Sequence, residues 1–95
     1  MTIDELRVEI DRLDDELLRI FNQRADIALK IGEIKKGLGI AVYDPAREKA
    51  IFQRMKSKNP GPLDDDAIVR LFERVIDESR RLERIMTARE KPVED

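Results

Sequence analysis

The chain has 95 residues, of which 19 are basic and 21 acidic, so its formal charge is close to neutral at -2. This balance gives no support to general binding of nucleic acid or of an anionic membrane surface, which needs a basic surface. Cysteine and histidine are absent, which excludes disulfide bonds, thiol nucleophiles and imidazole bases.

A long amphipathic helix is predicted over residues 3–37. Thr2 followed three positions later by Glu5 matches a capping box, a pattern that begins helices. Apolar residues then recur at alternating steps of three and four, as on one face of a helix. The pattern ends near Gly37 and Gly39, which suit a helix C-terminus. The apolar seam consists of Ile3, Leu6, Ile10, Leu13, Leu17, Ile20, Ile27, Ile31, Ile34 and Leu38.

A second helix is predicted over residues 45–58. Asp44 is suited to cap its first turn, and Pro45 suits the first helical position because its missing N–H would be unpaired there anyway. Ile51 lies on its apolar face, and the Pro-Gly-Pro run at 60–62 ends the element.

A third helix is predicted over about residues 65–87, and it starts with an acidic run at 64–66 that favours the positive end of a helix dipole. We expect the charged tail, residues 88–95, to be flexible. No segment has a strand pattern, so the predicted fold is all-α, with one long and two shorter helices in a single domain spanning residues 1–95.

The length of the first helix predicts a homodimer. About 35 residues at ~1.5 Å each make a helix of roughly 50 Å, whereas a compact globule of this size is only about 30 Å across. The apolar seam continues along the whole helix, so a partner must cover the excess. An intertwined two-fold dimer is the simplest closed solution.

Several polar residues occupy positions where apolar ones are expected. Arg24 stands in the apolar seam, and Lys35 shares its face after three turns. Ser79 and Glu83 interrupt the apolar stripe of the third helix. One interpretation is structural: Arg24 reaches solvent, or Glu83 pairs internally with Arg24 or Arg47. The other is an anion site, because guanidinium groups match carboxylate geometry. The pattern alone leaves both open.

Arg7 raises a geometric question. It precedes Arg24 by 17 residues, roughly 25 Å along one rigid helix, so one small ligand cannot touch both within a single chain. In an antiparallel dimer of long helices, Arg7 of one subunit approaches the middle of its partner. Each of two equivalent pockets would then draw on both chains.

Taken together, these residues resemble the all-helical AroQ class of chorismate mutases over about residues 3–86. Each fragment is weak alone, but their order and separations are specific. The fragments are Leu6-Arg7, Ile10-Asp11, Leu13-Asp14, Asn22-Gln23-Arg24, Gly32-x-x-Lys35, Val42-Tyr43-Asp44-Pro45-Ala46-Arg47-Glu48-Lys49, Leu71-Phe72 and Ile76-x-x-Ser79-x-x-x-Glu83.

The resemblance implies an isomerase that converts chorismate to prephenate by an intramolecular Claisen rearrangement, in phenylalanine and tyrosine biosynthesis. Such a reaction needs no cofactor, no metal and no covalent intermediate. It needs the substrate held in its reactive shape and the charge on its ether oxygen stabilised. The implied binding partner is chorismate, with no nucleic acid and no membrane.

The resemblance also implies a role for each site residue. Arg24 and the partner subunit's Arg7 would clamp the substrate carboxylates, and Lys35 would bind a carboxylate and the ether oxygen. The catalytic residues would be Arg24, Lys35 and Glu83, with Glu83 across the ether oxygen from Lys35. The remaining substrate-binding residues would be Arg47 and Ser79 near the carboxylates, and Asp44 and Glu48 at the substrate hydroxyl.

Position 83 varies within the family, where glutamine is common. A glutamate donates a hydrogen bond only when it is protonated, so we hypothesise that Glu83 acts as a neutral acid. Burial and the dianionic substrate would raise its pKa, and Lys35 would lower it. The sequence does not rank these effects.

Other functions stay open at this stage. The sequence also resembles isochorismate-pyruvate lyases, which share this fold. A non-catalytic helical dimerisation or regulatory module would also explain the apolar seam. The interpretation as a non-catalytic module gives no reason why polar residues interrupt the apolar faces at Arg24, Lys35, Ser79 and Glu83. A partner enzyme of aromatic amino acid biosynthesis is a further binding partner that the resemblance allows. The N-terminus does not resemble a signal peptide, so we expect a cytoplasmic protein.

Overall fold

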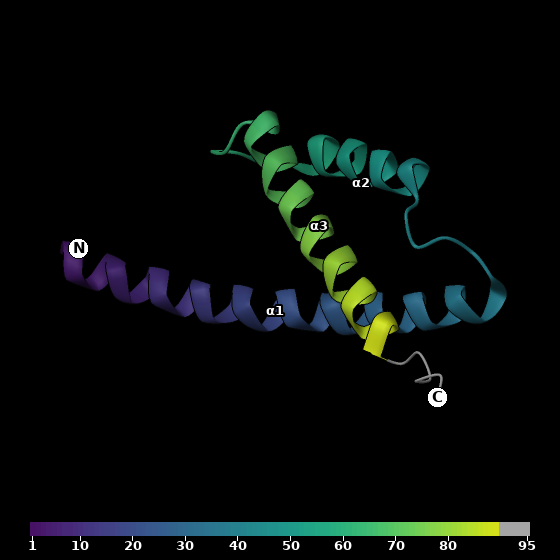
Figure 1. Ribbon diagram of the computed structural model, residues 1–95. Coiled ribbons are helices and arrows are strands. Elements are labelled where there is room, and N and C mark those ends of the chain that lie inside the picture. The colour runs from purple at the N-terminus through teal and green to yellow at the C-terminus, as the bar shows by residue number, and fades with distance from the viewer. Residues whose placement is uncertain (90–95) are drawn as a thin grey trace.

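The computed structural model describes the backbone of residues 1–89 and the side chains of residues 1–87. It contains three α-helices: α1 (Ile3–Leu38), α2 (Pro45–Lys58) and α3 (Asp65–Arg89). Figure 1 shows α3 crossing the second half of α1, with α2 near the first half of α3 and at an angle to it. The all-α, three-helix prediction is confirmed. Residues 88 and 89 of the expected flexible tail belong to α3, and residues 90–95 lie outside the described residues.

Helix α1 begins and ends where its capping residues predict. The Thr2 hydroxyl oxygen accepts a hydrogen bond from the Glu5 N–H at 3.1 Å, which satisfies one of the unpaired donors of the first turn. Gly39 ends the helix with φ at 69°, in the left-handed region that glycine adopts without a Cβ penalty. Gly37 was also a candidate for this role, but it lies inside the helix.

Aspartate side chains cap the other two helices. An Asp44 carboxylate oxygen accepts from the Arg47 N–H at 3.0 Å, and an Asp64 oxygen accepts from the Ala67 N–H at 2.7 Å. Between α2 and α3, the Asn59 amide donates to the Leu63 carbonyl at 2.7 Å. These local bonds set the ends of α2 and α3, and therefore where their side chains point.

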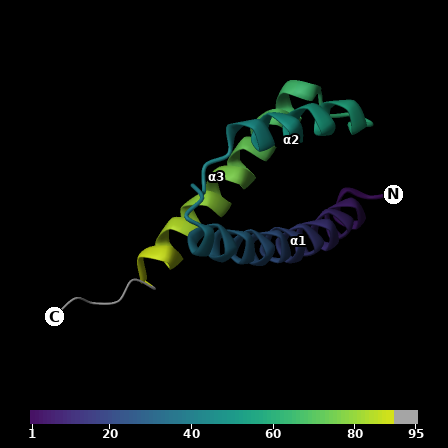
Figure 2. The ribbon, with the colours of Figure 1, turned by 90° about the vertical axis from the view of Figure 1, so that its right-hand side faces the viewer.

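Helix α3 packs against both α1 and α2. In Figure 2, α2 lies along α3, while α1 diverges from this pair toward the N-terminus. Ile51 of α2 and Ile76 of α3 are the buried apolar side chains of the core. The core is therefore small and sits where the three helices come together.

The apolar seam of α1 is exposed in the single chain. All ten of its residues have exposed fractions between 44% and 68%. The Cα atoms span 63 × 28 × 15 Å, and the N-terminal half of α1 extends away from the other helices (Figure 1). None of the helices in residues 1–89 is long and apolar enough to cross a membrane.

Candidate active site

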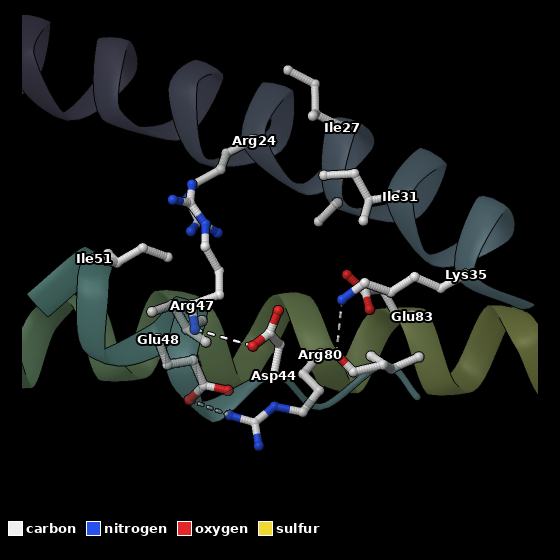
Figure 3. A pocket seen from close by; sticks show the side chains of 13 residues that line it. Arg24, Ile27, Ile31, Lys35, Asp44, Arg47, Glu48, Ile51, Arg80 and Glu83 are labelled. Carbon is white, nitrogen blue, oxygen red and sulfur yellow. Dashed lines mark hydrogen bonds and ion pairs between the residues drawn. The ribbon is translucent and has the colours of Figure 1, made fainter. Parts of the chain in front are cut away.

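A cavity of about 250 Å³ lies between the second half of α1, the start of α2 and the middle of α3 (Figure 3). The three elements meet there because α3 packs on both others. Its apolar walls come from isoleucines and small residues, and its polar lining is mostly charged. The lining residues are Arg24, Ile27, Ala28, Ile31, Lys35, Val42, Asp44, Arg47, Glu48, Ile51, Ile76, Arg80 and Glu83.

Three cations reach this cavity without a carboxylate partner among the described side chains. Figure 3 shows Arg24 and Arg47 pointing toward each other from α1 and α2, with Lys35 at the other end. Arg24 donates a hydrogen bond to the buried Ser79 hydroxyl at 3.3 Å, and Lys35 donates to the Val42 carbonyl at 3.4 Å. Among residues 1–87, no carboxylate forms an ion pair with any of these three cations.

Burial and the neighbouring positive charges both affect Arg24. Its pKa is lowered, first by burial and then by the nearby Arg47 and Arg54 guanidinium groups, and Glu83 acts in the opposite direction. A guanidinium remains charged despite such a shift. The arrangement therefore holds like charges close together in a partly desolvated space, which an anionic ligand would stabilise.

Glu83 is the acid at the Lys35 end of the cavity. Burial raises the pKa of its carboxyl group, and the Lys35, Arg80 and Arg24 cations only partly offset this effect. The internal ion pair of Glu83 with Arg24 or Arg47, one of the two predicted alternatives, does not form among the described side chains. The structure thus ranks two effects on the Glu83 pKa that the sequence left unranked: the increase caused by burial outweighs the decrease caused by Lys35.

Asp44 and Glu48 line the cavity from the N-terminus of α2. Asp44 uses a carboxylate oxygen to cap the helix, so its side chain is already engaged. The Glu48 carboxylate accepts from Arg80 at 3.1 Å. In the part of the chain that the structure describes, no group of three or more acidic residues is arranged to hold a metal ion.

The structure brings together seven of the eight predicted site residues. Six line the cavity: Arg24, Lys35, Asp44, Arg47, Glu48 and Glu83. The seventh, Ser79, is bonded to Arg24. Arg7 lies far along α1; its side chain is 73% exposed and its carboxylate neighbour is Asp4 at 3.9 Å. This separation agrees with the expectation that Arg7 cannot complete the site of its own chain.

Arg80 is a charged residue of the cavity that is absent from the predicted site. It lines the cavity from α3 and pairs with Glu48. Its spacing contained a usable signal, because it follows Ile76 by four residues and precedes Glu83 by three, which places it on their face.

Comparison with known proteins identifies the family. The sequence profile of chorismate mutase type II matches residues 6–84. The chain belongs to the type II chorismate mutase family. A chorismate mutase from Methanocaldococcus jannaschii is 31% identical over 81 residues, which cover 84% of this chain and 82% of that protein.

A solved chorismate mutase shares the fold as well as the sequence pattern. The structure of the Helicobacter pylori chorismate mutase in complex with prephenate superposes with a TM-score of 0.87 at 31% identity, covering 94% of this chain and 97% of that one. A bifunctional chorismate mutase/prephenate dehydratase from Neisseria gonorrhoeae is 48% identical over 90 residues, 90% of this chain. The chain spans 24% of the length of that relative.

Proposed function

We propose that this chain catalyses the intramolecular Claisen rearrangement of chorismate to prephenate, a step of phenylalanine and tyrosine biosynthesis. The observation that carries the proposal is the meeting of Arg24, Lys35 and Arg47 in one cavity, without a carboxylate partner among residues 1–87. Chorismate has two carboxylates, which suit guanidinium and ammonium groups placed in this way. The family membership of the chain and the prephenate complex of the H. pylori relative support the same substrate.

The proposed mechanism uses binding and electrostatics alone. A pericyclic rearrangement breaks one bond as another forms, so no nucleophile is needed. Arg24 and Arg47 would hold the carboxylates on rigid helices and thereby favour the reactive shape of the substrate. Fixed donors around the ether oxygen would stabilise the negative charge that grows there in the transition state.

Lys35 and Glu83 are the donors that we assign to the ether oxygen. Both extend into the same end of the cavity (Figure 3), and the raised pKa of Glu83 favours the protonated form that can donate. At the opposite wall, we assign the substrate hydroxyl to the Glu48 carboxylate. Asp44 would contribute through its backbone, because its side chain caps α2.

We also propose that the working form is a homodimer in which the partner subunit's Arg7 completes each site. The exposed apolar seam supports a partner along α1. A second, apolar hollow of about 530 Å³ supports the same arrangement. It lies between α1 and α3, and its lining includes Leu17, Phe21, Leu71 and Phe72. Covering this surface with a second copy would bury apolar area that the monomer leaves in water.

The test is the conversion of chorismate by the purified chain, followed by loss of its absorbance and by identification of the product. We expect prephenate, and we expect Arg24→Met to lower kcat/KM by about a hundredfold or more, as for loss of a transition-state donor. Lys30→Met on the same helix serves as the matched control. Release of pyruvate would point to a lyase instead, and no conversion would favour a non-catalytic helical module.

The proposal is limited to the rearrangement. The dehydratase activity named for the N. gonorrhoeae relative is no part of it, because this chain spans 24% of that protein.

A further inference from the structure

Arg80 has three partners, and they come from three different segments. Its Nη2 atom donates to a Glu48 carboxylate oxygen of α2 at 3.1 Å and to an Asp77 oxygen of α3 at 2.9 Å. Its guanidinium carbon lies 4.8 Å from the ring centroid of Tyr43, in the connection before α2. Contacts on these sides fix the plane of the guanidinium as well as its position.

The Arg80–Glu48 pair is more buried than the ion pairs that lie along the helix surfaces in the described part of the chain. The side chains of Arg80 and Glu48 are only 17% and 19% exposed, whereas Arg12–Glu16 and Arg74–Glu78 lie along helix surfaces in water. Exposed ion pairs of that kind contribute little to the stability of the fold. In a partly desolvated pair, removal of one member leaves the other charge without compensation, so it costs more stability than removal of one member of an exposed pair.

Glu48 needs this support because of where it lies. It is in the first turn of α2, close to Asp44, and it lines the cavity. In Figure 3 the Glu48 side chain turns toward Arg80 at the edge of the cavity. Among the described residues, Arg80 is the cation that pairs with Glu48. Without Arg80, the Glu48 carboxylate would be free to adopt other rotamers.

We propose that Arg80 is a positioning residue for substrate recognition: it holds the Glu48 carboxylate in one orientation, directed at the ring hydroxyl of the substrate. This role rests on the proposed function, because that function places the hydroxyl at Glu48. An ionised carboxylate accepts a hydrogen bond from a hydroxyl group, and a carboxylate with a fixed geometry accepts it without losing further side-chain freedom.

The kinetic signature follows from when the contact is made. The ring hydroxyl takes no part in bond making or breaking, so its hydrogen bond is equally present in the bound substrate and in the transition state. Loss of such a contact raises KM and leaves kcat nearly unchanged. A purely structural role would not separate the two constants in this way.

The experiment compares Arg80→Met with the native chain on two substrates, chorismate and an analogue that lacks the ring hydroxyl. For chorismate, we expect KM to rise about tenfold with kcat nearly constant, the scale of one charged hydrogen bond. For the deoxy analogue, we expect native and variant kcat/KM values within about twofold of each other. Equal losses on both substrates would overturn the role.

Three further variants keep the result interpretable. Arg81→Met is the matched control, because Arg81 lies on the exposed face of the same helix, and we expect native kinetics. Arg80→Lys should have a KM between those of the native chain and Arg80→Met, since an ammonium still pairs with Glu48 but lacks the planar contact with Tyr43. In a Glu48→Gln background, Arg80→Met should have little further effect.

The same measurements separate this inference from the function on which it rests. Turnover of chorismate by the native chain supports the proposed function whatever Arg80 does, and its absence would overturn both. A native chain that is active, with an Arg80→Met variant that loses kcat at unchanged KM, would overturn the positioning role alone. Thermal unfolding of each variant shows whether the protein is still folded. A folded Arg80→Met variant that loses kcat/KM equally on both substrates would also overturn the positioning role.

Discussion

Gly32 of α1 leaves the space that the Glu83 side chain of α3 occupies. A β-carbon at position 32 would lie 3.3 Å from Glu83 Cγ and 3.4 Å from its Cδ. Gly32 is buried inside α1, so the two helices approach closely at this point. The position of the Glu83 carboxyl in the cavity therefore depends on the absence of a side chain one helix away.

Gly32→Ala is expected to lower activity without lowering stability. The added methyl group forces Glu83 to shift by a few tenths of an ångström, while alanine favours the helix by about 0.5–1 kcal/mol. We expect kcat/KM to fall about tenfold through misplacement of the acid. Steady-state kinetics and thermal unfolding measure the two effects.

Gly37→Ala is the matched control for this substitution. It also lies in α1, but a β-carbon there meets no atom within 4 Å among those described. We expect the same helix stabilisation with native kinetics. Native kcat/KM in Gly32→Ala would show that the site does not depend on this close approach.

The raised pKa of Glu83 predicts a pH dependence. Burial raises the pKa of this carboxyl group, and the protonated fraction falls as the pH rises through that value. Since only the protonated acid donates a hydrogen bond, kcat/KM should decline with rising pH. The dianionic substrate raises the pKa further, so kcat should decline at a higher pH than kcat/KM.

Glu83→Gln provides the comparison for the pH profile. Glutamine donates at every pH, so the decline assigned to Glu83 should disappear from the variant. A flat profile for the native chain, or a decline that persists unchanged in Glu83→Gln, would contradict the assignment.

The proposed sharing of sites predicts complementation between inactive chains. Arg7→Ala and Arg24→Ala should each be inactive alone. In a mixed dimer, one site regains both arginines and the other loses both. Random exchange at equal amounts should therefore restore about a quarter of the native activity. Persistent inactivity despite demonstrated subunit exchange would mean that the sites are not shared.

The small core predicts a high sensitivity to truncation. Ile76 is one of the buried apolar side chains and also lines the cavity. Ile76→Ala should destabilise the protein by about 2–4 kcal/mol. Val8→Ala, at an exposed position of α1 outside the apolar seam, is expected to cost far less. Equal losses of stability in chemical denaturation would contradict this description of the core.

The helices could be predicted from the sequence because local chemistry determines where they begin and end. Thr2, Asp44 and Gly39 act within one turn of their own positions, so their roles are readable without the fold. The shared face of Arg24 and Lys35 was likewise accessible from helical periodicity alone.

The tertiary contacts of the site could not be predicted in this way. The Arg80–Glu48 pair joins residues that are 32 positions apart, and the Gly32–Glu83 approach depends on how α3 crosses α1. The effects on the Glu83 pKa could be named from the sequence, but their order depends on actual burial. Periodicity gives the face of a helix and not what lies opposite it.

The most direct test of the central claim is to follow chorismate and its product together by proton NMR in the presence of the native chain. We expect chorismate to be lost far faster than in the absence of protein, with prephenate appearing in equal amount and with no added metal or cofactor. Loss of chorismate at only the uncatalysed rate, or appearance of a product other than prephenate, would contradict it.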